Sequence, residues 1–287
     1  MNYQWYPGHM TKAVRMMQEN IKLIDLVIEL VDARIPLSSR NPDIDKLAAG
    51  KFRIVLLNKS DLADPACNRQ WVQYFEQQQI HVLEVNSRTG SGVKDIQGLV
   101  QETCKEKIER DRRRGIVNRP VRAMVVGIPN VGKSTFINSF AGKACTKTGN
   151  KPGVTKGKQW IRLNKGLELL DTPGILWPKF EDQQVGMKLA FIGSMNDDVI
   201  LADELACDLI RCLQQLYPQA LPKRYDIDGV GDPPQVLAQI AERRGCYGRG
   251  QELELERAAG LLLEDFRSGR LGRITLEHPQ NIKTENM

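Results

Sequence analysis

The sequence predicts an α/β fold with a mostly parallel sheet, followed by a small α-helical domain. In the first part of the chain, β-rich runs alternate with helix-like runs, and this alternation places parallel strands between two layers of helices. Beyond Pro178 the apolar residues instead recur at helical spacing, as Leu205 and Leu209 do. We therefore expect one domain over residues 1–178 and a second over 179–287, both of ordinary size.

Each element follows from a local pattern of apolar residues. The predicted strands cover residues 25–31, 53–57, 81–85, 121–126, 159–163 and 167–171. The predicted helices cover residues 11–23, 68–78, 92–113 and 133–141, then 198–216, 233–244 and 251–267 in the second domain. A connector rich in Pro and Gly covers residues 217–234. The tail beyond Glu277 has the composition of a disordered terminus.

A complete phosphate-binding loop stands between a predicted strand and a predicted helix. Residues 127–134 read GIPNVGKS, which is the pattern G-x-x-x-x-G-K-S. Glycines let the backbone curl so that successive N–H groups point at phosphate oxygens, and the following helix adds its positive dipole end. The lysine of such a loop reaches the β- and γ-phosphates, and the serine hydroxyl ligates Mg²⁺. We expect a nucleoside triphosphate to be bound by Asn130, Val131, Gly132, Lys133, Ser134 and Thr135.

A second motif specifies the base. Asn58, Lys59 and Asp61 form the pattern N-K-x-D after an apolar run. A carboxylate at its last position accepts hydrogen bonds from the N1–H and 2-amino groups of guanine. Adenine offers neither donor, so the carboxylate would lose its partners. Asn86 and Ser87, after the next strand, resemble a second and weaker guanine motif in which only the serine matches. The sequence thus predicts binding of GTP and GDP.

A third motif concerns the metal ion and the γ-phosphate. Residues 171–174 read DTPG at the end of a strand. We expect Asp171 to hold Mg²⁺ through water and the Gly174 N–H to meet the γ-phosphate. Thr155 follows Lys133 by 22 residues, a spacing that favours a switch threonine whose hydroxyl completes the Mg²⁺ shell with that of Ser134.

The motifs occur in an unusual order. In Ras-like GTPases the phosphate loop comes first and N-K-x-D comes late, whereas here residues 58–61 precede residues 127–134. This order is a circular permutation, which is allowed because domain termini commonly lie close together. The cut falls between residues 171–174 and the helix predicted at 11–23. The first domain is therefore predicted to be a circularly permuted Ras-like P-loop GTPase domain.

This order and four further motifs resemble the ribosome biogenesis GTPase A (YlqF/RbgA) family. The motifs are WYPGHM at 5–10, DARIP at 32–36, SRNP at 39–42 and DTPGILWP at 171–178. The resemblance implies a GTPase that assists maturation of the large ribosomal subunit and binds the rRNA and proteins of its precursor. Two alternatives are a GTP-dependent binding switch with negligible catalysis and a permuted GTPase of the small subunit. The family of the latter kind carries a nucleic-acid barrel and a zinc motif, for which this sequence has no pattern.

Composition bounds the remaining possibilities. The sequence has no apolar run of 18 residues and no apolar signal core, so we expect a cytoplasmic monomer without a membrane partner. Its six cysteines form no C-x-x-C pair, which favours reduced thiols over structural zinc. Because the net charge of +6 is moderate, its distribution matters more than its size. Arg112, Arg113 and Arg114 form either a solvated helix face or a phosphate-contact patch. The late arginines of the second domain leave the same choice between RNA contact and solubility.

The catalytic residue is the least evident part of the site. Ras-like GTPases commonly place Gln directly after D-x-x-G, but that position is Ile175 here. His9 is the candidate, because a neutral imidazole accepts a hydrogen bond from water. The alternative is that it caps or packs the N-terminal helix. Asn130 holds the position that resembles the potassium ligand of K⁺-activated GTPases, which implies K⁺ beside Mg²⁺; the alternative is an ordinary turn residue.

Overall fold

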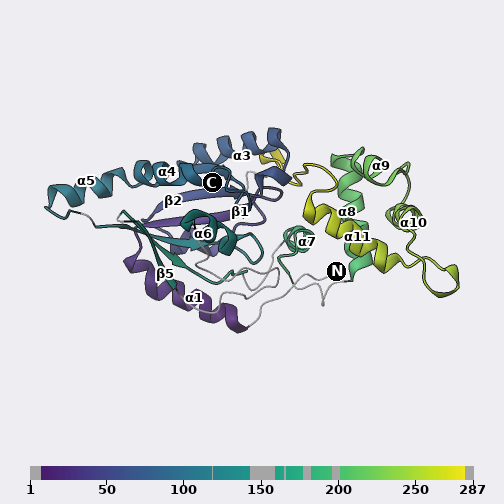
Figure 1. The fold of residues 1–287 in the computed structure, drawn as a ribbon, viewed down its shortest axis with the longest axis horizontal. Coiled ribbons are helices and arrows are strands. Elements are labelled where there is room, and N and C mark those ends of the chain that lie inside the picture. The colour runs from purple at the N-terminus through teal and green to yellow at the C-terminus, as the bar shows by residue number, and fades with distance from the viewer. Residues whose placement is uncertain are drawn as a thin grey trace.

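The computed structural model describes residues 8–117, 119–142, 159–164, 166–176, 182–195 and 201–281, and at residues 8–13, 159 and 281 it describes the backbone alone. A sheet flanked by helices occupies one end of the molecule, and a group of helices occupies the other (Figure 1). The predicted order of an α/β region followed by a helical region is confirmed.

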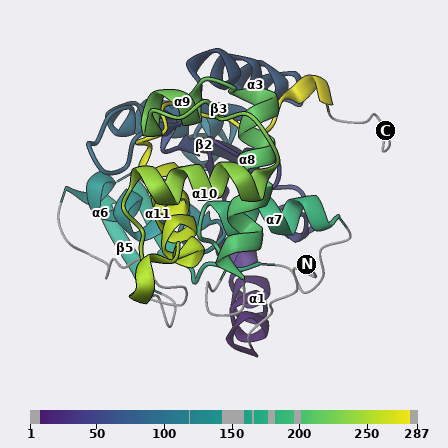
Figure 2. The same cartoon turned by 90° about the vertical axis from the view of Figure 1, so that its right-hand side faces the viewer.

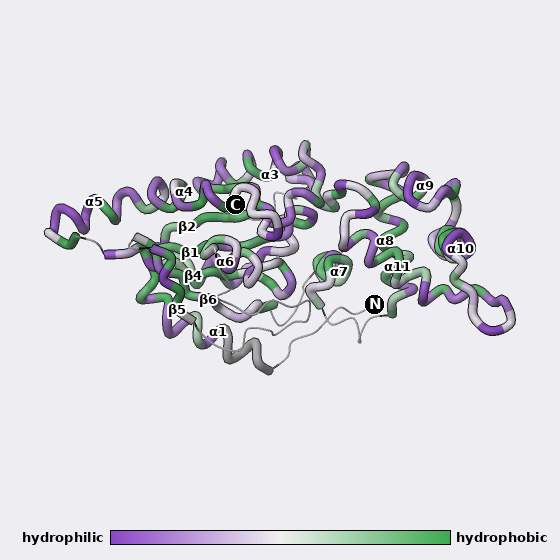
Figure 3. Tube along the Cα trace, viewed as in Figure 1, coloured by the Kyte–Doolittle hydropathy of each residue, from purple (hydrophilic) through white to green (hydrophobic). Residues whose placement is uncertain are grey.

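Six strands form one sheet in the order β3-β2-β1-β4-β6-β5. They are β1 (Leu26–Asp32), β2 (Phe52–Asn58), β3 (His81–Val85), β4 (Val121–Val126), β5 (Gln159–Asn164) and β6 (Leu167–Asp171). All neighbouring pairs are parallel except β5 and β6, which form an antiparallel pair. Every residue of β1 is buried, as expected for a parallel strand covered on both faces. Figure 3 shows the central strands as a hydrophobic block.

Helices cover the two faces of this sheet. They are α1 (Gly8–Asn20), α2 (Asp43–Leu47), α3 (Pro65–Gln77), α4 (Ile96–Thr103), α5 (Lys105–Arg113) and α6 (Lys133–Ala141). In both views α3 lies above the sheet and α1 lies below it (Figures 1 and 2). Trp71 and Phe75 of α3 pack against Val31, Val55 and Leu57 of the sheet. Short 3-10 helices are η1 (Ile21–Leu23), η2 (Ser60–Leu62), η3 (Val93–Asp95), η5 (Arg249–Gln251) and η6 (Pro279–Asn281).

The helical region continues the core of the sheet region. It contains α7 (Gln183–Phe191), α8 (Ala202–Leu216), α9 (Ala220–Tyr225), α10 (Pro233–Arg243) and α11 (Leu255–Ser268). Leu209, Ile240 and Phe266 from α8, α10 and α11 are buried in the same contiguous apolar cluster as Leu30 and Val125 from β1 and β4. Residues on both sides of the predicted boundary at 178 therefore share one hydrophobic core, and the division into two domains stays a prediction.

Several elements differ from the sequence-based expectation. The helix predicted at 92–113 consists of η3, α4 and α5, because the backbone leaves the helical region at Cys104 with φ −97° and ψ 14°. The break divides an apolar helix from the charged α5, which Figure 3 shows as hydrophilic. α3 begins at Pro65, since the Asp64 carboxylate accepts a hydrogen bond from the Ala66 N–H at 2.8 Å and so caps the helix. The sequence-based prediction missed α7. It also missed the short α9, which lies inside the predicted connector.

The C-terminal segment returns to the sheet region. The buried Glu277 carboxylate accepts hydrogen bonds from the Leu37 N–H at 2.7 Å and from Lys188 Nζ at 3.1 Å. Its backbone oxygen accepts from Trp71 Nε1 at 3.0 Å, and η6 follows it. The expectation of disorder beyond Glu277 is therefore wrong as far as residue 281, because tertiary contacts order a segment whose composition is polar. Among the helices of the described residues, none has both the length and the apolar character needed to cross a membrane.

Candidate nucleotide site

The predicted motifs meet at one edge of the sheet. β1, β2, β3, β4 and β6 are parallel neighbours, and the register aligns Asp32 with Asn58, Asn58 with Val85, and Val125 with Asp171. The carboxyl ends of these strands are where open α/β sheets bind ligands. The N-K-x-D motif, the Ser87 segment, the phosphate loop and residues 171–174 all begin there, so the topology brings them together as the sequence predicted.

The phosphate loop joins β4 to α6 in a backbone conformation that requires glycine. Gly132 has φ +98°, and a Cβ atom there would lie 2.5 Å from Asn58 Nδ2. Asn130 also has a positive φ, of 58°, which Asn tolerates better than most residues. Lys133 opens α6, and its side chain is buried.

Asn58 connects the phosphate loop to the two guanine motifs. Its Nδ2 atom donates to the Val131 carbonyl at 2.7 Å. Its Oδ1 atom accepts from the Ser87 N–H at 3.1 Å and from the Ser87 hydroxyl at 2.7 Å. Both Asn58 and Ser87 are buried. One amide therefore holds three loops in register.

Lys59 makes a second connection between the same loops. It lies in the left-handed region with φ 58°, and its Nζ atom donates to the Asn130 carbonyl at 2.9 Å. The same Nζ lies 3.0 Å from Asp32 Oδ2. Asp32 is fully buried and also receives a bidentate pair from Arg34, with Nε–Oδ1 and Nη2–Oδ2 distances of 2.8 Å each.

The Asp32 carboxylate is ionised inside the protein. Burial by itself would raise the pKa of Asp32, but the Arg34 guanidinium and the Lys59 ammonium outweigh burial and hold this pKa well below its ordinary value. Sequence reasoning used residues 32–36 for the family resemblance but missed this role. The signal was present: Asp32 follows the apolar pair Leu30 and Val31, and a carboxylate and a guanidinium two residues apart need each other if both are buried.

Asp61 lies in η2, directly after the Asn58–Lys59 pair. Its side chain is half-buried, and among the residues that the structure describes no hydrogen-bond donor meets its carboxylate. The neighbouring Ser60 hydroxyl donates to the Val85 carbonyl at 3.2 Å, which ties this turn to the end of β3. Asn86 Oδ1 accepts from the Arg88 and Thr89 N–H groups at 2.9 and 3.1 Å and so shapes the turn that carries Ser87. Its contact with the nucleotide stays a prediction.

Asp171 ends β6 beside the phosphate loop. It is fully buried, and neither carboxylate oxygen meets a hydrogen-bond partner of good geometry among the described residues. Burial raises the pKa of Asp171, against the opposing effects of the nearby Lys133 ammonium and the Thr172 N–H. Burial likewise lowers the pKa of Lys133, which the Asp171 carboxylate opposes. A buried carboxylate with orphaned oxygens near Lys133 of the phosphate loop fits a hydrated Mg²⁺ ion, which takes oxygen ligands.

The residues after Asp171 pack on the phosphate loop. The Thr172 hydroxyl donates to the Val125 carbonyl at 2.7 Å. A Cβ atom at Gly174 would lie 2.9 Å from Pro129 N, so only glycine permits this approach. The Ile175 N–H donates to the Gly127 carbonyl at 3.3 Å, and its side chain is 2% exposed. Ile175 therefore belongs to the core and offers no polar atom to a water molecule.

A segment of the helical region also contacts the phosphate loop, which the sequence did not suggest. Asn130 Nδ2 donates to the Gly193 carbonyl at 2.6 Å, and the buried Ser194 hydroxyl donates to the Pro129 carbonyl at 2.7 Å. Gly193 and Ser194 follow α7, about 60 residues beyond the loop in the sequence. No local pattern announces such a contact, because it depends on where α7 packs.

Two predicted residues lie outside this description. Thr155 is not among the described residues. For His9 the backbone is described, as the second residue of α1, but the side chain is not. α1 thus begins at Gly8, and His9 lies in its first turn instead of ahead of the helix.

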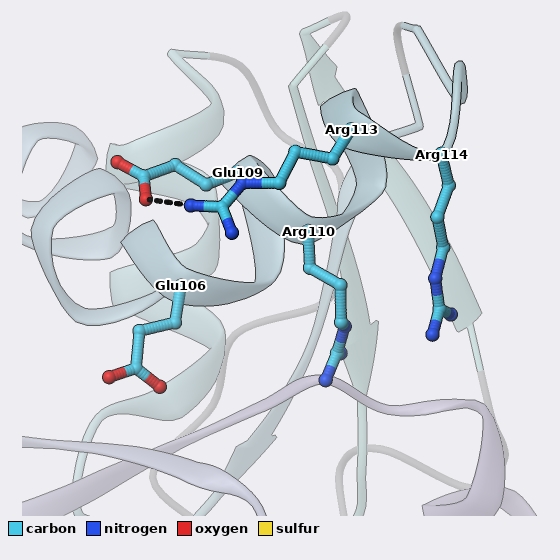
Figure 4. A pocket seen from close by; sticks show the side chains of 5 residues that line it. All are labelled: Glu106, Glu109, Arg110, Arg113 and Arg114. Carbon is cyan, nitrogen blue, oxygen red and sulfur yellow. Dashed lines mark ion pairs between the residues drawn. The ribbon is translucent and has the colours of Figure 1, made fainter.

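A second concave surface lies at the opposite end of the molecule from the helical region. It is lined by Glu106, Glu109, Arg110, Arg113 and Arg114 on one side of α5 and at its end (Figure 4). Glu109 and Arg113 approach to 3.8 Å, whereas Arg110 and Arg114 extend away from this pair. None of the nucleotide motifs contributes to it, so it is a separate feature of the surface.

Known proteins share this arrangement over nearly the whole chain. A family model described as 50S ribosome-binding GTPase matches residues 122–215. Ribosome biogenesis GTPase A of Priestia megaterium is 47% identical over 285 residues, which cover 99% of this chain and 99% of that protein. The chain belongs to the ribosome biogenesis GTPase A family. The protein of the same name from Bacillus cereus is 45% identical over 98% of this chain and 96% of its own length.

The solved structures agree with this family. GNP-bound YlqF from T. maritima superposes with a TM-score of 0.66 at 27% identity, covering 94% of this chain and 100% of that chain. The family resemblance and the fold predicted from the sequence are confirmed. The 50S ribosome-binding GTPase match contains the phosphate loop and residues 171–174 but begins after residues 58–61, as the permuted order requires in a ribosome biogenesis GTPase A.

Proposed function

We propose that this chain is a GTPase that binds the precursor of the large ribosomal subunit and is released or reset by GTP hydrolysis. The observation that carries the proposal is the Asn58 side chain, which ties the phosphate loop to the guanine motifs through Val131 and Ser87. A guanine base and its phosphates can then be held by one rigid unit. Family membership supplies the large subunit as the partner, since the relatives are named ribosome biogenesis GTPase A.

We assign the base to Asp61 and its neighbours. The Asp61 carboxylate is half-buried and meets no hydrogen-bond donor among the described residues, so it is suited to the N1–H and 2-amino groups of guanine. Asn58 Nδ2 carries two hydrogens, of which the Val131 carbonyl takes one. The other suits an acceptor on the base. Lys59 contributes by supporting the loop, because its ammonium already contacts Asn130 and Asp32.

We assign the phosphates to the loop at residues 127–134 and to Lys133, Ser134 and Thr135. Mg²⁺, when bound, neutralises charge on the β- and γ-phosphate oxygens. Ser134 and Asp171 would hold it, Asp171 through water, and Thr155 is proposed as the switch ligand that completes its shell. Gly174 lies against Pro129 of the phosphate loop. This position supports the proposal that the Gly174 N–H is directed at the γ-phosphate. Burial disfavours the negative charge of Asp171, and a bound cation would compensate that charge.

Catalysis needs a polar group that Ile175 cannot supply. We propose that His9 orients the attacking water, because α1 directly continues the switch segment in the unpermuted order. A K⁺ ion is proposed as a second cation near the phosphates, with Asn130 as its ligand. An amide oxygen is an acceptor and an amide nitrogen is a donor, so Oδ1 is the Asn130 atom whose chemistry suits a cation, while Nδ2 donates to the Gly193 carbonyl. With such limited machinery, we expect slow hydrolysis alone and stimulation by the ribosomal subunit.

We propose that the helical region, residues 179–287, supplies contacts to rRNA and ribosomal proteins, with the chain acting as a cytoplasmic monomer. Exposed arginines support RNA contact: Arg243, Arg244 and Arg249 in the helical region, and Arg112 and Arg114 at the end of α5. Phosphate contacts of this kind make binding steeply dependent on salt.

A second function is favoured by the burial of Ile175. Without a polar residue at that position, the chain would be a GTP-dependent binding switch with negligible catalysis of its own. Two measurements separate the functions: GTP turnover with and without large ribosomal subunits, and co-sedimentation with those subunits in GDP, in a non-hydrolysable GTP analogue and without nucleotide. Subunit-stimulated turnover and nucleotide-dependent co-sedimentation are the expected results. Binding that depends on nucleotide without measurable turnover would favour the switch, and no co-sedimentation in any state would refute both.

A further inference from the structure

The loop after α7 forms part of the scaffold of the phosphate loop. Ser194 is fully buried, and its hydroxyl is the donor to the Pro129 carbonyl at 2.7 Å. Gly193 accepts from the Asn130 side chain at 2.6 Å. Pro129 and Asn130 are two of the four variable positions of the G-x-x-x-x-G-K-S pattern, so the conformation of this loop depends on a segment of the helical region.

The Arg267 side chain holds the end of α7 and the loop that follows it in place. Arg267, near the end of α11, donates from Nε to the Phe191 carbonyl at 3.0 Å and from Nη2 to the Ala190 carbonyl at 2.8 Å. These carbonyls belong to the last turn of α7, where α-helical partners are lacking, and the Ala190 carbonyl also accepts from the Gly193 N–H at 3.0 Å. The Arg267 side chain also lies against Gly193, within 3.3 Å of where a Cβ would stand. α11 thus fixes the end of α7 and the loop that follows it.

The end of α11 is fixed in turn by the sheet region. Arg34, 1% exposed, donates from Nη1 to the carbonyls of Phe266 and Arg267, each at 3.3 Å. The rest of its guanidinium forms the bidentate pair with Asp32. Asp32 contacts Lys59, and Lys59 returns to the Asn130 carbonyl.

These contacts close a ring through both regions. From Pro129 and Asn130 it runs through Ser194 and Gly193 to the end of α7, through Arg267 to the end of α11, through Arg34 to Asp32, and through Lys59 back to Asn130. Asp32, Arg34 and Ser194 are buried, and Lys59, Asn130 and Arg267 are partly buried. Hydrogen bonds to charged groups are strong in such surroundings, and a broken one leaves an unpaired group. A ring of this kind resists partial rearrangement, so the phosphate loop and the ends of α7 and α11 keep their mutual positions as one unit.

We propose that this polar ring couples nucleotide binding to the placement of the helical region, with Ser194, Arg267 and Arg34 as positioning residues for the phosphate loop. The inference rests on the proposed function, since it assumes that the phosphate loop binds GDP and GTP. A nucleotide that orders Pro129 and Asn130 also orders the loop after α7 and, through Arg267, the end of α11. If bound nucleotide changes the affinity of the helical region for a partner, linkage requires that the partner change nucleotide affinity by the same factor. This coupling would allow GTP hydrolysis at the phosphate loop to release a ribosomal precursor from the helical region.

Hydrogen exchange of the full chain with GDP and Mg²⁺ tests the coupling directly. In the wild type, GDP should slow exchange at α7, at residues 192–195 and at the last turn of α11, as well as at the phosphate loop. In Ser194→Ala and Arg267→Met, GDP should still protect the phosphate loop, but the protection of the α11 end should be lost. Both variants should bind GDP about fivefold more weakly or worse, the low end of typical coupling between sites.

Matched controls lie at the last residue of α11 and just beyond it. Arg270 pairs with Asp265 of α11 at 2.9 Å, and the Ser268 hydroxyl donates to the Glu264 carbonyl of α11 at 2.7 Å; neither belongs to the ring. Arg270→Met and Ser268→Ala should therefore keep wild-type GDP affinity and wild-type protection. A wild type that binds GDP without protection of α7 and α11 would overturn the coupling alone. Protection that persists in Ser194→Ala and Arg267→Met would overturn the ring as its route. A wild type that fails to bind GDP would overturn the proposed function as well.

Discussion

Substitutions at Asn58 can separate the two roles of its amide, which donates to Val131 and accepts from Ser87. Asn58→Asp keeps an oxygen that accepts from the Ser87 N–H and hydroxyl, at 3.1 and 2.7 Å in the wild type. It removes the donor to the Val131 carbonyl, a bond of 2.7 Å, and sets a carboxylate oxygen against that carbonyl. The connection to the phosphate loop is lost, together with the Nδ2 hydrogen proposed for the base, whereas Asn58→Ala also loses both bonds to Ser87.

The magnitude follows from burial. A buried acceptor left without its donor costs about 1–3 kcal/mol, and the Val131 carbonyl is in this position in Asn58→Asp. If that cost appears as disorder of the phosphate loop that GTP must reverse, GTP affinity falls by roughly 5- to 150-fold, since 1.4 kcal/mol is a factor of ten. Asn58→Ala should show a similar loss of affinity together with a lower melting temperature, because the Ser87 N–H is then also unpaired.

The assay is titration with a fluorescent GTP analogue, paired with thermal unfolding of each variant. Asn164→Asp is the matched control: its Oδ1 accepts from the Gly166 N–H at 2.7 Å in the β5–β6 hairpin, and the change adds the same charge away from the loops. It should leave GTP affinity within twofold of wild type. If Asn58→Asp also binds GTP within twofold of wild type, the connection between the guanine motif and the phosphate loop does not set affinity, and the reasoning fails.

Four further outcomes are expected. Asp61→Asn should weaken GTP and favour xanthosine triphosphate, since a lost charged hydrogen bond is worth about 1.5–3 kcal/mol; unchanged GTP binding would remove Asp61 from base recognition. Hydrolysis should be faster in K⁺ than in Na⁺, and Asn130→Ala should abolish the difference, whereas equal wild-type rates in both salts would exclude the ion. His9→Ala should keep GTP affinity within a few-fold but slow subunit-stimulated hydrolysis at least about tenfold; a wild-type rate on subunits would show that His9 is not catalytic. Asp32 has a folded pKa below its ordinary 3.8 despite burial, because of Arg34 and Lys59, so its ionisation stabilises the fold above that pH, and the gain is lost as pH falls through the folded pKa. Asp32→Asn should therefore show a shallower loss of stability below about pH 4, and an identical acid profile would contradict this account.

Much of the fold and most of the site were readable because they depend on local patterns. Apolar runs such as residues 54–57 mark buried strands, and the segments GIPNVGKS and NKSD carry their chemistry in residue type and spacing. Because parallel strands end at one edge of a sheet, the motifs could be placed in one pocket before any contact was known. The family resemblance rested on the same short segments.

Other features were decided only when the chain was folded. Asn86 is predicted at the nucleotide, and its side-chain oxygen also accepts from two N–H groups of its own turn, a contact that the sequence did not indicate. Ser194 and Arg267 have no motif, because their roles depend on the packing of α7 and α11 on the sheet region. The tail up to residue 281 is held by Glu277 contacts to Leu37 and Lys188.

The sequence by itself determined the chemistry of each loop, since phosphate and guanine recognition need particular residues at fixed spacing. The tertiary structure alone decided which loops share their contacts. Asp32 and Arg34 stand two residues apart in any extended chain, but they become an ionised buried pair only when Lys59 on one side and the end of α11 on the other complete their hydrogen bonds. The physical reason is that a buried charge is stable only when all its partners are present, and here those partners come from segments more than 200 residues apart.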